Sequence, residues 1–289
     1  MGGFFLFFCM RHLVFLIFCV LWGSGAVALA ESASVSPGVA RRHVSSLKFE
    51  KGSYTSIFGL VPKKYSLESA ESREILQKTV DERHFSLELV ASETRRILSI
   101  PEEAPLIETL PKPLTGSTVQ ATQQGETWEF EVPGRPELTE DEMKEARRLV
   151  ARYQPGASPL AGITWGPEGA GTLDLQKLLT FLGYTQLSEV SGEAKVQKSG
   201  AAAGADDSFT VEVKAAFLSG EGGSRLSVEL EAKGTAVVTT GGEAKQGMML
   251  QGRLVLHGQR DLSDGRRVPY SLETDFRYET QSAVPPAGS

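Results

Sequence analysis

The C-terminal third of the chain alternates apolar and polar residues with a period of two over several long runs. In residues 209–217 the apolar side chains share one phase, and Glu212 and Lys214 occupy the other. Residues 226–232, 248–256 and 268–278 repeat this pattern. Because successive side chains of a strand point to opposite faces, the pattern predicts strands with one buried and one solvated face. Such strands are typical of an antiparallel sheet over a core.

The connections between these runs are rich in glycine and suit tight turns between neighbouring strands. They fall at residues 219–224, 241–242 and 264–265. The sequence therefore predicts an antiparallel meander. Gly234 and Gly252 lie inside the runs, which predicts bulges or bends at these two positions.

Segments nearer the N-terminus alternate less cleanly but also predict strands. They are residues 47–57, 65–80, 84–91 and 118–132. A hairpin is expected at Gly125-Glu126, followed by a strand with Trp128 and Phe130 on its inner face. Residues 101–113 contain four prolines and predict an extended connector.

Two helices are predicted between the strands. Near 139–153, Thr139 followed by Glu142 has the spacing of a capping box, and Leu138 with Met143 suits a hydrophobic staple. The expected buried stripe of this helix consists of Met143, Ala146, Leu149, Val150 and Tyr153.

The second helix is predicted near 173–182, with Thr172 as its cap and Gly183 as a left-handed terminator. The predicted fold class is thus mainly β, an antiparallel meander forming a curved sheet or half-barrel with two packed helices. The expected segments are a signal peptide at 1–30, a flexible segment at 31–45, a β-rich domain at 46–280 and a flexible tail at 281–289.

Residues 1–30 have the pattern of a secretory signal peptide. Met10-Arg11-His12 is a short basic start, residues 13–22 are apolar, and Ala28-Leu29-Ala30 suits a cleavage site. The apolar run is shorter than the about 20 residues of a membrane-spanning helix, so cleavage is expected, with no integral membrane segment afterwards. Met1 and Met10 are both candidate starts. The absence of Asn and the abundance of Ala, Gly and Arg favour a bacterial source and a periplasmic or cell-envelope location.

Cys9 and Cys19 are the two cysteines, and both precede the expected cleavage site. A mature chain without cysteine excludes disulfides, thiolate catalysis and cysteine-ligated metals. The net charge of −6 and the lack of a long basic stripe argue against a nucleic-acid partner.

No pattern in the chain predicts catalysis, a metal or a cofactor, and we expect a protein that is not an enzyme. The chain lacks a Gly-x-Ser-x-Gly nucleophile motif. Residues 166–172 resemble a phosphate-binding loop in outline, but Gly171 stands where lysine is needed and Glu168 repels phosphate. A loop leading into a helix cap is the preferred interpretation.

The histidines after the signal segment do not have the short spacing of a zinc site. His43 falls in the expected flexible segment. His84 and His257 fall near turns or on polar strand faces, which predicts solvated surface side chains.

Several segments resemble uncharacterised exported bacterial β-rich proteins. They are residues 113–119, residues 127–130, the capped helix near 139–153 and the strand containing residues 250–252. The resemblance implies an exported β-rich fold and no activity.

Two functions follow as expectations. The first is a non-enzymatic cell-envelope protein that serves as an interaction or structural module for another envelope protein. The alternative is a periplasmic carrier that binds an apolar ligand or lipid in the concave face of the sheet. Its candidate pocket residues are Phe209, Phe217, Met248 and Phe276. A core filled by its own side chains favours the first function, and a cavity favours the second. An integral outer-membrane barrel is disfavoured by the two helices and the few clean strands.

Overall fold

The structure is a computed structural model. It describes residue 38 and residues 40–58, 61–99, 104–155, 157, 159, 163–165, 169–184, 186–199, 206–220, 225–239, 246–261 and 267–284. The expected signal peptide, Cys9 and Cys19 lie outside the described residues.

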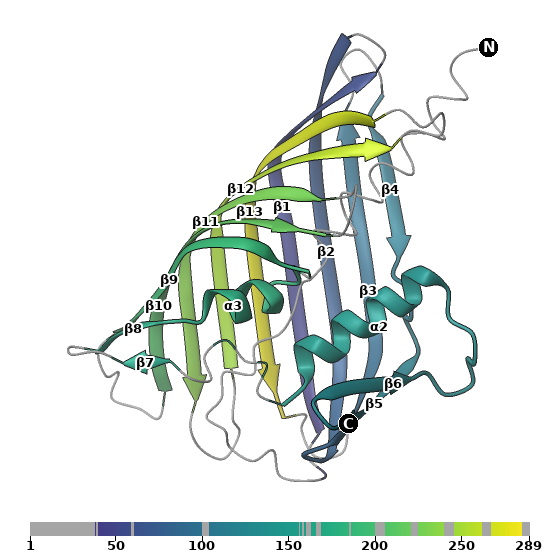
Figure 1. The fold of residues 1–289 in the computed structure, drawn as a ribbon, viewed down its shortest axis with the longest axis vertical. Helices are drawn as coiled ribbons and strands as arrows, with labels where there is room; N and C mark the ends of the chain where they lie inside the picture. The colour runs from purple at the N-terminus through teal and green to yellow at the C-terminus, as the bar shows by residue number, and fades with distance from the viewer. Residues whose placement is uncertain are drawn as a thin grey trace.

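Thirteen strands of the described residues form one antiparallel sheet (Figure 1). In chain order the strands are β1 (Ala40–Phe58), β2 (Val61–Asp81), β3 (His84–Ser99), β4 (Leu106–Pro111), β5 (Thr118–Gln124), β6 (Thr127–Glu131), β7 (Thr164–Trp165), β8 (Ala170–Thr172), β9 (Ser188–Ser199), β10 (Asp206–Ser219), β11 (Leu226–Thr239), β12 (Gln246–Asp261) and β13 (Arg267–Ala283). Their order across the sheet is β6-β5-β3-β2-β1-β13-β12-β11-β10-β9-β8-β7, and β4 pairs with β3 beside this path.

The sheet is curved and open, and it carries two helices, as the sequence predicted (Figure 1). Strands β9 to β13 are neighbours in chain order and form the predicted meander. The first strand, β1, pairs with the last strand, β13, from Arg42 opposite Ala283 to Ser56 opposite Tyr270. The two ends of the described chain therefore meet in the middle of the sheet.

Some strands extend beyond their expected limits. β1 begins at Ala40, inside the segment that was expected to be flexible, and β13 continues to Ala283. β4 forms within the proline-rich connector, and β9 was not predicted. Pairing with a neighbouring strand supplies hydrogen bonds that weak local patterns do not reveal.

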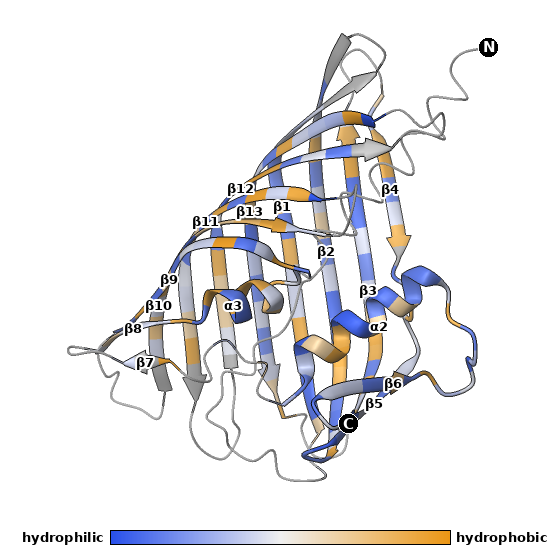
Figure 2. Cartoon of the chain, viewed as in Figure 1, coloured by the Kyte–Doolittle hydropathy of each residue, from blue (hydrophilic) through white to orange (hydrophobic). Residues whose placement is uncertain are grey.

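The predicted alternation of faces is confirmed along the long strands. The inward apolar residues of β10 and β11 are buried, among them Phe217 and Leu230. Hydrophilic and hydrophobic residues alternate along these strands in Figure 2. On the outward face, Lys233 lies 2.8 Å from Glu212 across β10 and β11, and these side chains are largely exposed. The convex face is thus charged and solvated.

Of the bulges or bends predicted at Gly234 and Gly252, bulges are not formed. β12 keeps an uninterrupted register with β11 and with β13 through both positions. A Cβ atom at Gly252 would lie 1.9 Å from the carbonyl oxygen of Glu231, and one at Gly234 would lie 1.8 Å from that of Met249. Both glycines therefore permit a close approach of neighbouring strand backbones.

Helix α2 (Glu140–Tyr153) begins with the predicted capping box. The backbone N–H of Glu142 donates to Oγ1 of Thr139 at 3.3 Å, and the N–H of Thr139 donates to Oε2 of Glu142 at 2.9 Å. The predicted buried stripe is confirmed except at Met143, which is exposed. Its sulfur accepts a hydrogen bond from Arg147 on the outer side of the helix.

Helix α3 (Leu175–Phe181) is shorter than predicted, and its cap is Asp174 rather than Thr172. A side-chain oxygen of Asp174 accepts a hydrogen bond from the N–H of Lys177 at 3.0 Å. Thr172 instead ends β8. Gly183 has a φ of 97° and ends the helix in the predicted left-handed conformation.

Both helices lie inside the curve of the sheet (Figure 1). Two apolar clusters fill the space between helices and sheet. One contains α3 residues with inward side chains of β1 and β9 to β13, and the other contains α2 residues with inward side chains of β2, β3 and β5. The concave face is thus divided into an α3 half and an α2 half.

Candidate binding site on the concave face

A band of buried polar residues separates the two apolar clusters on the concave face. On β3, Leu89 belongs to the α2 cluster and Leu98 to the α3 cluster, with polar inward positions between them. We call this band the polar seam. It consists of His43, Ser45, Glu71, Arg73, Gln77, Ser92, Thr94, Arg96, Lys112, Glu145, Arg152, Thr280 and Ser282.

Ion pairs join helix α2 to the sheet through the polar seam. Nη2 of Arg73 lies 2.8 Å from Oε1 of Glu145 on α2 and 3.4 Å from Oε1 of Glu71, its neighbour on the same face of β2. Nζ of Lys112, which follows β4, lies 3.0 Å from Oε2 of Glu71. All four side chains are at most 4% exposed, so solvent screens these pairs little.

Burial and charge act against each other in this group. Burial opposes the charge of Arg73, yet Glu145 and Glu71 together raise the pKa of its guanidinium. Burial lowers the pKa of Lys112 to about 8, although Glu71 favours its charged form. The carboxylates therefore hold Arg73 firmly in its charged state and Lys112 less firmly.

A hydrogen-bonded chain connects β1 to the C-terminal end of α2. The side-chain amide of Gln77 donates to the carbonyl oxygen of Tyr153 at 3.1 Å. Its Oε1 therefore faces Nε2 of His43, at 2.9 Å, as an acceptor. In the neutral state of His43, Nε2 carries the proton and Nδ1 is an acceptor.

His43 is a neutral side chain at ordinary pH. Burial lowers the pKa of His43 to about 4, and the nearby charges of Arg41 and Arg152 act in the same direction. The hydrogen bond to Gln77 opposes this shift only in part. The unperturbed pKa is 6.5, so the fold strongly disfavours the imidazolium.

We expect the protein to lose stability as pH falls from 6.5 towards 4, because the unfolded chain protonates His43 in this range and the folded protein does not. Between pH 7 and pH 5, His43 should account for a loss of about 2 kcal/mol in the free energy of unfolding. Urea denaturation at both pH values, in buffer without phosphate, measures this difference.

Carboxylates also titrate at acid pH, so the variant His43→Gln supplies the comparison. Its stability should depend on pH less steeply than that of the wild type. The matched control is His257→Gln, which removes an exposed imidazole of the outer strand face and should retain the wild-type dependence. Equal pH dependence in wild type and His43→Gln would contradict the expectation.

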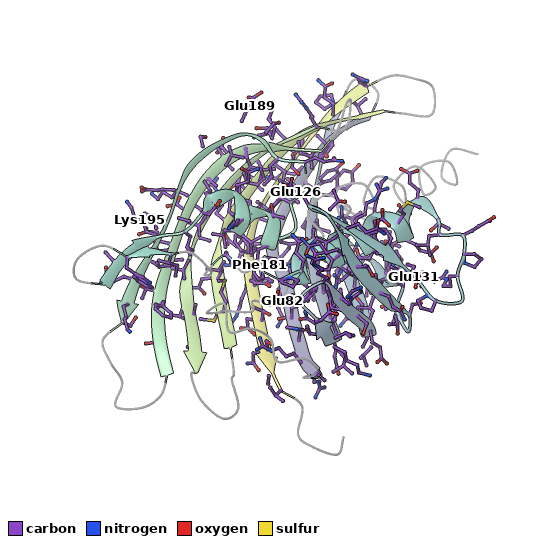
Figure 3. All side chains as sticks on the ribbon, turned by 60° about the horizontal axis from the view of Figure 1, so that its bottom comes forward. Glu82, Glu126, Glu131, Phe181, Glu189 and Lys195 are labelled. Carbon is purple, nitrogen blue, oxygen red and sulfur yellow. The ribbon has the colours of Figure 1, made fainter. Side chains whose placement is uncertain are left out.

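Arg152 occupies the junction between the polar seam and the α3 half. Its guanidinium carbon lies 5.5 Å from the centre of the Phe181 ring, a cation–π distance. Phe181 lies among the side chains inside the curve of the sheet, whereas Lys195 lies at its periphery (Figure 3). The seam therefore meets the apolar α3 half at Arg152.

The four predicted pocket residues have different neighbours in the described part of the structure. Phe209 stacks on Trp165 with ring centres 5.6 Å apart, and Phe217 meets Tyr184 edge-on at 4.8 Å. Met248 is buried in the α3 cluster. Of the four candidates, Phe276 lines a small cavity of about 30 Å³. The other residues lining this cavity are Leu47, Phe49, Leu182, Tyr184, Leu230, Leu254 and Tyr278.

The sequence interpretation missed the polar seam. His43 was expected in a flexible segment, but it is buried in β1 and is about 1% exposed. Glu71 and Arg73 share the inward phase of β2 with Leu67 and Ile75. Charged residues at inward positions of a strand were the available signal for buried polar groups. In the sequence, they only made the alternation of apolar and polar residues look irregular.

The other residues considered for chemistry lie away from the seam. His84 and His257 are exposed, as predicted. Residues 170–172 of the glycine-rich loop form β8, which pairs with β9. These residues therefore belong to the sheet, and the helix that follows them is capped by Asp174.

Within the part of the chain that the structure describes, no group of three or more His, Cys, Asp or Glu residues is placed to hold a metal ion. No helix of the described residues has the length and apolar character needed to cross a membrane. The chain matches no protein-family model and no curated protein sequence.

Proposed function

We propose that the protein is exported to the cell envelope and serves there as a non-enzymatic interaction or structural module. The observation that carries this proposal is the filling of the concave face by the protein's own side chains. Helices α2 and α3 cover the two halves of this face, and apolar clusters occupy the space beneath them.

The size of the cavity at Phe276 supports this choice over a carrier. Pockets for drug-sized ligands enclose about 300 to 1,000 Å³, whereas this cavity encloses about 30 Å³. That volume suits about one or two water molecules rather than an acyl chain. The faces open to a partner are the charged convex side of the sheet and its edges.

Native mass spectrometry of protein purified without detergent tests the proposal. We expect the mass of the polypeptide alone, because the cavity at Phe276 is too small for a lipid and apolar side chains fill the described part of the concave face. Phe276→Trp, which fills the cavity, should give the same result and fold normally.

The carrier function is the alternative outcome of the same measurement. An apolar molecule that copurifies with the wild type and is lost in Phe276→Trp would contradict the module function and support the carrier function. The cavity beside Phe276 is the observation that favours this second candidate.

Export is part of the proposal and has its own test. The signal-like pattern of residues 1–30 supports cleavage after Ala30, which would leave a mature chain without cysteine. N-terminal sequencing of the protein from the periplasmic fraction of a bacterial host should begin at Glu31. Retention of an uncleaved chain in the cytoplasm would contradict export.

A further inference from the structure

The polar seam contains more buried positive than negative charge. Among the described residues, the charged side chains of this band are four cations and two carboxylates, namely Arg73, Arg96, Lys112 and Arg152 with Glu71 and Glu145. Glu108 is partly exposed and lies 3.8 Å from Arg96, so it offsets charge at that end of the seam. The remaining cation of the seam, Arg152, lies at the opposite end, where its charge acts on His43.

Three basic side chains from two elements form this opposite end. Arg41 and His43 point inward from β1, and Arg152 comes from the last turn of α2. The charges of both arginines act on His43. Burial lowers the pKa of the Arg152 guanidinium; Tyr278 and Tyr153 oppose this shift, and the charge of Arg73 adds to it. We call these three residues the basic cluster.

Two nitrogen atoms of the basic cluster indicate that a ligand binds there. Nε of Arg41 and Nδ1 of His43 are buried, and neither has a hydrogen-bond partner among the described residues. The contacts with Gln77 and Tyr153 hold the imidazole in place, so Nδ1 is oriented but not satisfied. Buried polar atoms of this kind are rare in native proteins and require an explanation.

We propose that the basic cluster binds a phosphate group, with Arg41 and Arg152 as charged donors and His43 donating from Nδ1. Guanidinium groups bind phosphate oxygens through paired hydrogen bonds, and a doubly charged anion matches two arginines. Arg41 is only partly buried, which gives the cluster a path to solvent.

The phosphate group can come from free inorganic phosphate or from the head group of a lipid. The small cavity lies close by, since Tyr278 lines it and also acts electrostatically on Arg152. A comparison of inorganic phosphate with dihexanoyl phosphatidate distinguishes the two sources. Dihexanoyl phosphatidate carries a phosphate group on a glycerol with two short acyl chains. Tighter binding of phosphatidate indicates a head group and would also favour the carrier function, whereas equal binding indicates the free anion. Both results support the phosphate site.

Calorimetric titration with inorganic phosphate, together with NMR titration of the His43 imidazole, tests the site. Phosphate should bind at pH 7 through the guanidinium groups of Arg41 and Arg152, with His43 donating as well once it is protonated at lower pH. It should also raise the midpoint of the His43 titration by about one pH unit, since a bound anion stabilises the imidazolium. The charged and titratable groups around the cluster are Glu71, Arg73, Tyr153 and Tyr278.

Matched variants locate the binding. Arg41→Gln and Arg152→Gln should each weaken phosphate binding about tenfold. Arg147→Gln should bind like the wild type, because Arg147 lies on the exposed side of α2. If Arg152→Gln does not fold, the binding measured for Arg41→Gln decides whether the cluster binds phosphate. Arg41 is only partly buried, so its replacement should disturb the fold less.

Two results would overturn the phosphate site. One is the absence of binding heat together with an unchanged His43 titration in millimolar phosphate. The other is equal weakening by Arg147→Gln, which would show a general attraction of phosphate to the basic surface. Neither result bears on the lipid content of the purified protein, so the module function is tested separately.

Discussion

Replacing Glu145 by Gln is expected to lower the free energy of unfolding by about 4 kcal/mol. Glu145 lies on α2, is about 3% exposed, and places Oε1 2.8 Å from Arg73. The neutral amide leaves Arg73 buried with Glu71 at 3.4 Å, and Glu71 is shared with Lys112. A buried guanidinium that shares one carboxylate with a lysine is costly because water cannot solvate it. Urea denaturation at pH 7 measures the loss.

The exposed ion pair on the same helix is the matched control. Glu140 and Lys144 are separated by one helical turn, and their side chains are largely exposed. Glu140→Gln should therefore lower the free energy of unfolding far less than Glu145→Gln does. Equal effects of Glu140→Gln and Glu145→Gln would show that the buried pair does not hold α2 on the sheet.

Replacing Gly252 by Ala is expected to destabilise the fold by more than about 3 kcal/mol. The new Cβ atom would lie 1.9 Å from the carbonyl oxygen of Glu231 and 2.7 Å from the Cα atom of Ala232. Both atoms belong to the backbone of β11, so no side chain can rotate to relieve the contact. The two strands would have to separate in the middle of the sheet. Thermal and urea denaturation measure the effect.

Gly247→Ala on the same strand is the control for this substitution. Its Cβ atom would lie 3.4 Å from the carbonyl oxygen of Thr280, close to an ordinary contact. The change should therefore alter stability by less than about 1 kcal/mol. A stable Gly252→Ala protein with wild-type cooperativity would contradict the close approach of β11 and β12.

The elements of the fold were predictable where a local pattern was complete. Alternation from Phe209 to Phe217 predicted a strand and its buried face, and Thr139 with Glu142 predicted the start of α2. Local hydrogen bonding and the geometry of a strand suffice for these inferences. The cap of α3 was predicted wrongly, because Thr172 and Asp174 both suit a cap and β8 takes Thr172 into the sheet.

The candidate site was not predictable in the same way. Gly252 is close to Glu231 only because β11 lies beside β12, and the sequence shows no trace of that distance. His43 is buried only because β1 pairs with both β2 and β13 and α2 covers its ring, which lies 4.9 Å from that of Tyr153. Burial and pKa arise from such long-range contacts.

By itself, the sequence determined that the chain forms an antiparallel meander with one apolar face, because a period of two leaves few other ways to bury those side chains. Tertiary structure decided what lies on that face. It brought Glu71, Arg73, Lys112 and Glu145 from three segments into one buried group and placed His43 near two arginines. Charges act through space, and only the folded sheet sets the distances at which they act.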